Sequence, residues 1–279
     1  MKHFRIAMLA LVLVSLALAA PLALAGRGIT VKGSDTMVIL GQRWAEQYMN
    51  ANRGQIVQVT GGGSGTGIAA LINGTTDICQ ASRPMKQDEK LKLRDRYQTM
   101  GVEIPVAKDG LSVFLNEANP VKDLTLDQLK QIYTGAITNW RQVGGKDATI
   151  VLYGRENSSG TYGFFKDHVL DGRDFAASCQ TLPGTAAVVN AVSRDPNGIG
   201  YGGAAYTKGV RDCAVRKDAK SPAVMPTAAT VHDGSYPLTR YLYFYLCKPA
   251  QGDVKKFVDW VLSPAGQKLA VEVGYYPLK

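Results

Sequence analysis

The chain has 279 residues, of which 46% are hydrophobic and 20% charged, and its formal net charge is +9. This length suffices for one large domain or for two lobes of ordinary size. The positive charge favours encounters with anions without identifying one. Because the lysines and arginines are scattered, with no block of five, no aromatic stripe and no zinc-finger spacing, nucleic acid is not expected as a partner.

The first 25 residues predict a secretory signal peptide. A basic start precedes an almost unbroken apolar run over 6–18, and a small-x-small cleavage pattern ends at Ala25. The apolar run is shorter than the roughly 20 residues of a membrane span, and no cysteine follows the cleavage site to carry a lipid anchor. We therefore expect a periplasmic protein of 254 residues, whose net charge falls from +9 to +7 because Lys2 and Arg5 are removed.

Four cysteines remain in the exported chain, and their spacing indicates no structural zinc site because none forms a CxxC pair. An even number of cysteines in an exported chain favours disulfides. Two alternatives stay open: the pairs Cys179–Cys213 and Cys79–Cys247, each within one lobe of the fold expected below, or free cysteines buried as small apolar residues.

The first half of the mature chain alternates between short β-branched strands and helices. Strands are expected from residue 31, over 56–60 and over 77–81, and helices over 36–50, from about 68 to Gly74, and over 87–99. The first helix has an apolar face formed by Met37, Leu40, Trp44 and Tyr48. This alternation predicts an α/β fold, in which helices cover both faces of a sheet.

The pattern restarts at Gly110. Strands are expected over 111–115, 150–153, 198–201 and 241–246, and helices over 125–133, 161–169, 186–192, 253–262 and 264–273. A capping box begins the helix at Thr125, and Ser263 with Pro264 begins the last one. Two α/β units are best explained by two lobes that face a cleft.

Three glycine- and hydroxyl-rich turns lead directly into predicted helices, at residues 33–36, 61–67 and 155–161. A helix N-terminus carries unpaired backbone N–H groups and a partial positive charge, so it attracts anions. Glycine lets an oxyanion approach the backbone, and serine or threonine adds a hydroxyl donor. Three such turns predict a small tetrahedral anion held between helix ends.

Arg155 is the strongest single candidate in these turns. It lies between a predicted strand and a predicted helix start, where a guanidinium can donate two parallel hydrogen bonds to an oxyanion. The alternative is a surface arginine paired with Glu156. Ser64 and Thr36 can bind an anion, cap their helices, or do both.

Enzymatic motifs are incomplete in this chain. The sequence around Ser64 lacks the second glycine of a nucleophile elbow, because Thr66 stands there. His168 and His232 lie in no recognisable motif, and neither a dinucleotide fingerprint nor a P-loop is present. We therefore expect no enzyme, no cofactor and no metal. A secreted phosphatase-like hydrolase remains the alternative from another class, without an activated nucleophile or metal constellation.

The order of the motifs resembles that of the periplasmic phosphate-binding proteins of phosphate-specific ABC importers. The resemblance covers essentially the whole mature chain and rests on residues 33–37, the glycine loop with Ser64, and residues 76–78, 81–84, 137–140, 155–161 and 197–201. It implies a two-lobed periplasmic binding protein of type II, in which each lobe is a central sheet flanked by helices and two crossing strands form the hinge. Lobe one would comprise 27–107 plus 240–279, and lobe two 108–239.

The same resemblance implies a monomer that binds inorganic phosphate in the cleft and delivers it to the membrane subunits of an ABC permease. The implied ligand residues are Ser34, Asp35, Thr36, Ser64, Arg83, Arg155, Ser159, Gly160 and Thr161. Sulfate, molybdate, tungstate and arsenate remain alternative ligands.

One position departs from the family pattern. Some family members carry an aspartate in the loop that is here 81–84, where it accepts the proton of bound phosphate, whereas this chain has Arg83. A carboxylate acceptor favours phosphate by repelling sulfate, which has no proton. Asp35 is either the replacement acceptor or only an acidic residue at a helix N-terminus. Arg83 either adds charge to the site or pairs with an acid.

Overall fold

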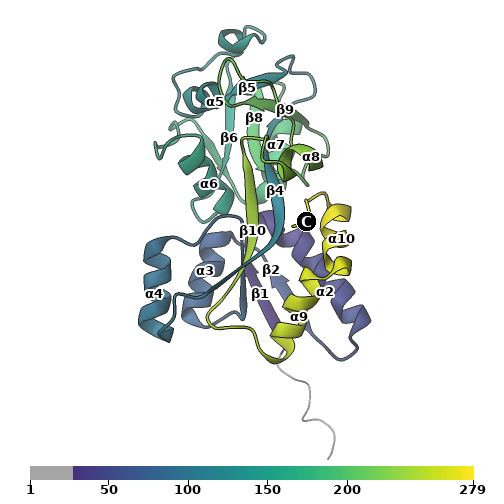
Figure 1. Ribbon diagram of the computed structural model, residues 1–279. Helices are drawn as coiled ribbons and strands as arrows, with labels where there is room; N and C mark the ends of the chain where they lie inside the picture. The colour runs from purple at the N-terminus through teal and green to yellow at the C-terminus, as the bar shows by residue number, and fades with distance from the viewer. Residues whose placement is uncertain (1–27) are drawn as a thin grey trace, which may run out of the picture.

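The computed structural model describes residues 28–279 and contains two lobes joined by two long strands (Figure 1). The predicted signal peptide and its cleavage site lie outside the described residues. Among the helices of residues 28–279, none combines the length and the apolar character that a membrane crossing requires.

The first lobe, at the bottom of Figure 1, has three parallel strands in the order β2-β1-β3. Its elements are β1 (Ile29–Gly33), η1 (Asp35–Met37), α2 (Val38–Ala51), β2 (Val57–Thr60), α3 (Ser64–Asn73), β3 (Ile78–Ala81), α4 (Gln87–Tyr97), α9 (Gly252–Leu262) and α10 (Pro264–Val273). The predicted apolar face of α2 is buried: Trp44 donates from Nε1 to the Gly266 carbonyl at 2.7 Å, and Tyr48 packs edge-on against Phe257.

The second lobe, at the top of Figure 1, is built around β8, β6 and β7, which are parallel to one another. Its elements are β5 (Asp123–Thr125), α5 (Leu126–Tyr133), η2 (Trp140–Val143), β6 (Val151–Arg155), α6 (Gly160–His168), β7 (Gln180–Leu182), α7 (Gly184–Arg194), β8 (Gly198–Gly203), β9 (Arg211–Arg216) and α8 (Ala228–His232). The capping box predicted at Thr125 is present, with the Thr125 hydroxyl accepting from the Gln128 N–H. Strands β5, β7 and β9 and helix α8 were not expected, because each is short or flanked by charged residues.

Two strands, β4 (Val102–Leu115) and β10 (Thr239–Leu246), run antiparallel between the lobes. Over 102–110 β4 pairs with β10, and over 111–115 it pairs with β8 and β9 of the second lobe. The sequence predicted only 111–115, because Pro105 and alternating exposed residues conceal the first part. β10 also pairs with β3, so these two strands form a continuous connection from one sheet to the other.

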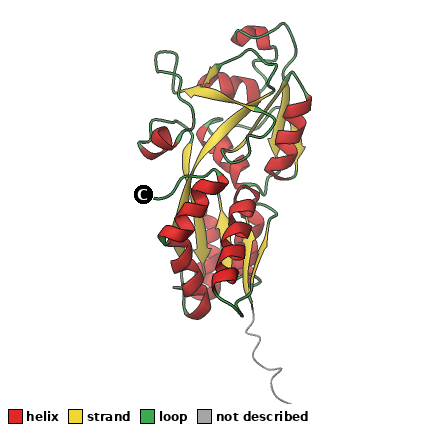
Figure 2. Ribbon diagram, turned by 90° about the vertical axis from the view of Figure 1, so that its right-hand side faces the viewer, coloured by secondary structure: helices red, strands yellow, loops and turns green. Residues whose placement is uncertain are grey.

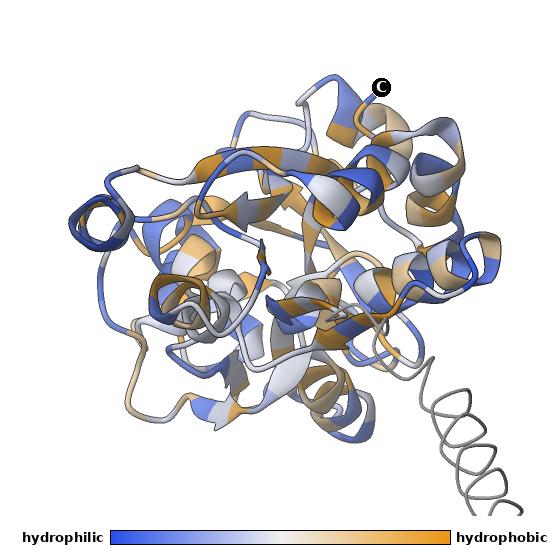
Figure 3. Ribbon diagram, turned by 90° about the horizontal axis from the view of Figure 1, so that it is seen from below, coloured by the Kyte–Doolittle hydropathy of each residue, from blue (hydrophilic) through white to orange (hydrophobic). Residues whose placement is uncertain are grey.

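Each lobe has its own apolar core. One large cluster of buried side chains is drawn from residues 29–107 and 242–275, and another from residues 111–238. Figure 2 shows strands at the centre of each lobe with helices outside them. In Figure 3 the interior strands are mainly hydrophobic, whereas α4 at the left edge is hydrophilic, in agreement with the expected charged surface helix.

The four cysteines are free, so the predicted pairs Cys179–Cys213 and Cys79–Cys247 are wrong. The other alternative holds, because Cys79 and Cys213 are buried among apolar side chains. The Cys247 and Cys213 thiols instead lie against the backbone carbonyls of Leu71 and Ala214. Burial raises the pKa of Cys179 to about 11 and that of Cys213 to about 12, which keeps these thiols protonated at neutral pH.

Candidate functional site

The three turns predicted from the sequence meet where the two lobes face each other. The first and third turns touch through the hydroxyl oxygens of Thr36 and Thr161, which are 2.8 Å apart. The second and third turns are joined by a hydrogen bond from the Gly65 N–H to the Ser158 carbonyl, 2.8 Å long. Residues more than 120 positions apart in the sequence therefore form one site.

Five hydroxyl side chains gather at this point, and we call them the hydroxyl cluster: Ser34, Thr36, Ser64, Ser82 and Thr161. The Ser34 hydroxyl donates to the Ser82 oxygen at 2.9 Å, and the Ser82 backbone N–H donates to the Ser64 oxygen at 3.1 Å. All five residues are buried. Such a group of neutral donors and acceptors can surround an oxyanion, because each hydroxyl can turn its hydrogen toward it.

Two helix N-termini point into the same region. Ser159 caps α6, and its hydroxyl accepts from the Tyr162 N–H at 3.2 Å. Within residues 28–279, the backbone N–H groups of Gly160 and Thr161, which open this helix, have no acceptor. Helix α3 begins at Ser64 without a side-chain cap, and the Gly65 N–H in its first turn donates to the Ser158 carbonyl. The site therefore combines hydroxyl donors with the positive ends of two helix dipoles.

The glycine loop allows the lobes to approach. Gly63 has φ = 90°, and a Cβ at this position would lie 2.5 Å from the Ser158 carbonyl oxygen of the other lobe. A residue with a side chain would be strained by its φ and would collide with the facing backbone. This loop is therefore shaped for a close contact between the lobes, as well as for starting α3.

Arg155 lies at the end of β6 and is 2% exposed, so the alternative of a surface arginine is wrong. Its pairing with Glu156 is nevertheless present: Nε and Nη2 donate to the two carboxylate oxygens at 3.1 and 2.9 Å. Nη2 also donates to Asp35 at 2.9 Å, and Nη1 donates to the Thr185 hydroxyl at 2.8 Å. Burial alone would raise the pKa of Glu156, but the hydrogen bond and charge of Arg155 outweigh it and lower that pKa.

Asp35 connects the first turn to both others. One carboxylate oxygen accepts from the Gly62 N–H at 2.7 Å, and the other accepts from Arg155. Its backbone carbonyl accepts from the Tyr206 hydroxyl at 2.9 Å. The side chain is 19% exposed, and in the sequence Asp35 lies between Ser34 and Thr36, two members of the hydroxyl cluster. Hydrogen bonds from Gly62, Arg155 and Tyr206 therefore hold Asp35 in place.

The structure does not bring Arg83 into the hydroxyl cluster. Its two terminal nitrogens donate to both carboxylate oxygens of Glu89 at 2.8 and 2.7 Å, and Nη1 also donates to the Pro84 carbonyl. The sequence left two roles open for Arg83, and the geometry favours the second, pairing with an acid. The departure from the family loop therefore adds an ion pair beside the site.

Three residues of the site were not predicted from the sequence: Ser82, Asp109 and Arg240. Ser82 lies at the centre of the hydroxyl cluster, and Arg240 donates from Nη2 to the Thr161 oxygen at 3.0 Å. Asp109 pairs with Arg240. Both charged residues lie just before the expected strands 111–115 and 241–246, and the structure places them at buried positions of the longer strands β4 and β10, where a buried charge requires a partner.

Comparison with known proteins gives the family. A model of the PBP superfamily domain matches residues 19–265. The chain belongs to the PBP superfamily. The chain is also 35% identical to the phosphate-binding protein PstS of Pseudomonas aeruginosa, with 88% of this chain and 81% of that protein covered. The phosphate-binding protein PstS of Staphylococcus haemolyticus is 35% identical over 85% of this chain and 75% of its own length. The chain therefore belongs to the substrate-binding proteins of phosphate ABC transporters, as the motif order implied.

Solved structures show the same fold. A Clostridium perfringens protein crystallised with bound phosphate, described as a candidate phosphate ABC transporter substrate-binding protein, has a TM-score of 0.82 and 29% identity, covering 91% of this chain and all of its own. An ABC-type phosphate transport receptor from Vibrio cholerae has a TM-score of 0.72 and 30% identity, covering 89% of this chain and 99% of its own. The expected two-lobed type II architecture is confirmed. Family members of this kind work outside the cytoplasm.

Proposed function

We propose that the chain binds inorganic phosphate between its lobes and delivers it to an ABC-type permease. The observation that carries the proposal is the convergence of the hydroxyl cluster with the first turns of α3 and α6. Donors from both lobes surround one buried point, which suits a small anion with several oxygens. The names of the relatives and the phosphate-bound neighbour support this ligand over other oxyanions.

Of the residues implied by the motif comparison, Arg83 is left out because it pairs with Glu89, and Ser82 is added; Asp35 is kept as the proposed proton acceptor and Arg155 as its paired cation. The remaining residues are the proposed hydrogen-bond donors to phosphate. They are Ser34, Thr36, Ser64, Ser82, Ser159, Gly160 and Thr161. Arg155 is the cation proposed to lie near them, and Asp35 and Glu156 hold its guanidinium in place. Direct contacts between the lobes, such as the bond from Gly65 to the Ser158 carbonyl, would hold the closed form around the ligand.

Several finer features belong to the same proposal. The lobes comprise 27–107 plus 240–279 and 108–239, with β4 and β10 as the hinge. The chain is exported by residues 1–25, cleaved after Ala25 and released into the periplasm without a lipid anchor. It acts there as a monomer, docks on the transmembrane subunits of a permease and performs no catalysis.

Calorimetry with the mature chain tests the ligand. We expect tight binding of phosphate and far weaker binding of sulfate. Hydroxyl groups can accept a hydrogen bond from the proton that phosphate carries near neutral pH, whereas sulfate has no proton to donate. Equal affinities for the two anions would contradict the assignment to phosphate. Turnover of a chromogenic phosphate ester, abolished by Ser64→Ala, would support the hydrolase alternative instead.

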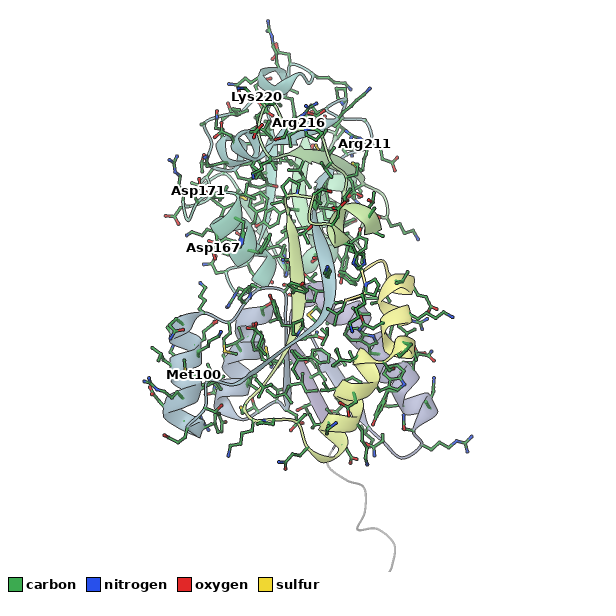
Figure 4. All side chains as sticks on the ribbon, in the orientation of Figure 1. Met100, Asp167, Asp171, Arg211, Arg216 and Lys220 are labelled. Carbon is green, nitrogen blue, oxygen red and sulfur yellow. The ribbon has the colours of Figure 1, made fainter. Side chains whose placement is uncertain are left out.

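Replacing Asp35 by asparagine tests the origin of this selectivity. A carboxylate in the turn of Ser34 and Thr36 accepts the proton of bound phosphate and repels the bare oxygens of sulfate. We expect Asp35→Asn to reduce the phosphate-to-sulfate affinity ratio by about tenfold, the effect of about 1.4 kcal/mol. Asp171→Asn serves as the matched control, since Asp171 lies on the outside of the second lobe (Figure 4). An unchanged ratio in Asp35→Asn would mean that another group selects phosphate.

A further inference from the structure

Asp109 and Arg240 form a buried ion pair on the two strands that connect the lobes. They face each other in the register of β4 and β10. Arg240 donates from Nε and Nη2 to one Asp109 oxygen at 2.9 and 2.7 Å, and the other oxygen accepts from the Ala204 N–H at 3.1 Å. Asp109 is 0% and Arg240 5% exposed. A pair so deeply buried is stable only when both charges are fully hydrogen-bonded.

The remaining donors of Arg240 reach both lobes. Nη1 donates to the Ser82 carbonyl, at the end of β3, at 3.1 Å. Nη2 donates to the Thr161 oxygen, at the start of α6, at 3.0 Å. The guanidinium also lies 5.3 Å from the centre of the Phe164 ring of α6. One side chain on a connecting strand therefore contacts a member of the hydroxyl cluster from each lobe.

These contacts restrict the direction of the Thr161 hydroxyl. A guanidinium has only donors, so the Thr161 oxygen must accept from Arg240 and its own hydrogen must point elsewhere. The neighbouring oxygen, at 2.8 Å, is that of Thr36. If Thr36 accepts this hydrogen, its own hydrogen is left to donate to a bound anion; if an anion is nearer, Thr161 donates to it directly. In either case one hydrogen of the threonine pair is free for the anion, and Arg240 directs the Thr161 hydrogen away from the guanidinium.

We propose that Arg240, neutralised by Asp109, is a positioning residue for the anion site: it sets Thr161 as a hydrogen-bond donor and links both lobes at the ligand. This inference rests on the proposed binding of phosphate. Arg240 touches no ligand in this scheme and acts only through Thr161 and the Ser82 backbone. The guanidinium is needed because one side chain must donate hydrogen bonds to Asp109, to the Ser82 carbonyl and to Thr161 at the same time. A lysine ammonium keeps the charge but lacks the planar fork that reaches all three.

The test is a double-mutant cycle read by phosphate calorimetry on the mature chain. We expect Arg240→Lys to weaken phosphate binding by at least about tenfold, in keeping with hydrogen bonds from charged groups. In a Thr161→Val background the same change should cost no more than about threefold, because the Thr161 hydroxyl is gone and only the contact with the Ser82 carbonyl remains to be lost. Arg216→Lys is the matched control, since Arg216 pairs with Asp123 far from the site (Figure 4) and should leave affinity unchanged.

Equal losses in the two backgrounds, or no loss with Arg240→Lys, would overturn the inference. If Arg240→Lys fails to fold, the double variant Asp109→Asn with Arg240→Gln replaces it, because removing both charges leaves no lone buried ion. This double variant should fold and bind phosphate at least about tenfold more weakly; unaltered affinity would overturn the inference. An unaltered protein that binds no phosphate would instead refute the proposed function.

Discussion

Arg155→Ala is expected to weaken phosphate binding at least about 100-fold, or about 2.8 kcal/mol. The loss has two causes. The proposed site loses its guanidinium, and the carboxylates of Asp35 and Glu156, with which Arg155 now pairs, are left without this cation near a negatively charged ligand. Removing one partner of a buried ion pair costs several kcal/mol, because the charge left behind is uncompensated.

The measurement is phosphate calorimetry on the mature chain, accompanied by thermal unfolding without phosphate. Arg155→Lys should fall between the unaltered protein and Arg155→Ala, since it keeps the charge but cannot hold two carboxylates and Thr185 at once. Arg216→Ala controls for the loss of an arginine in a partly exposed pair. An Arg155→Ala protein that is folded and binds phosphate with unchanged affinity would remove Arg155 from the site.

Each of the three turns was predictable because it is a local pattern. Glycines before Ser64 and the sequence around Arg155 indicate helix starts and donors within a few residues, and α/β alternation places such turns at strand ends. The family resemblance then supplied the arrangement of the lobes. What remained open were questions that local sequence does not answer, such as whether Glu156 holds Arg155 at the surface or in the interior.

The contribution of β4 and β10 could not be predicted in the same way. Arg240 and Asp109 are 131 residues apart, and only the strand register places them opposite each other. Arg83 shows the reverse difficulty: its position in a family loop suggested a ligand, but Glu89, six residues later on α4, binds its guanidinium at both oxygens. Partners determine whether a charged side chain reaches the site, and partners are set by tertiary structure.

Gly160→Ala is expected to abolish tight phosphate binding, with a loss of at least about 100-fold, or about 2.8 kcal/mol. A Cβ at Gly160 would lie 2.2 Å from the Ser64 hydroxyl oxygen and 2.7 Å from that of Ser82. Both serines belong to the first lobe and are fully buried, whereas Gly160 opens α6 of the second lobe. The added methyl group therefore keeps the lobes apart at the point where they must meet.

Calorimetry measures the loss, and small-angle scattering with excess phosphate should give a larger radius of gyration for Gly160→Ala than for the unaltered protein. The phosphate-free variant should be about as stable as the unaltered chain, because alanine is a better helix former than glycine and the clash arises only between closed lobes. Gly163→Ala, three residues further along α6, is the matched control. A Cβ at Gly163 would lie 3.3 Å from the flexible Arg83 side chain, so the phosphate affinity should change less than about threefold. If Gly160→Ala closed and bound phosphate normally, the contact between the α6 N-terminus and the serines would not be a requirement for binding, and the hydroxyl cluster could not be the place where the lobes share the anion.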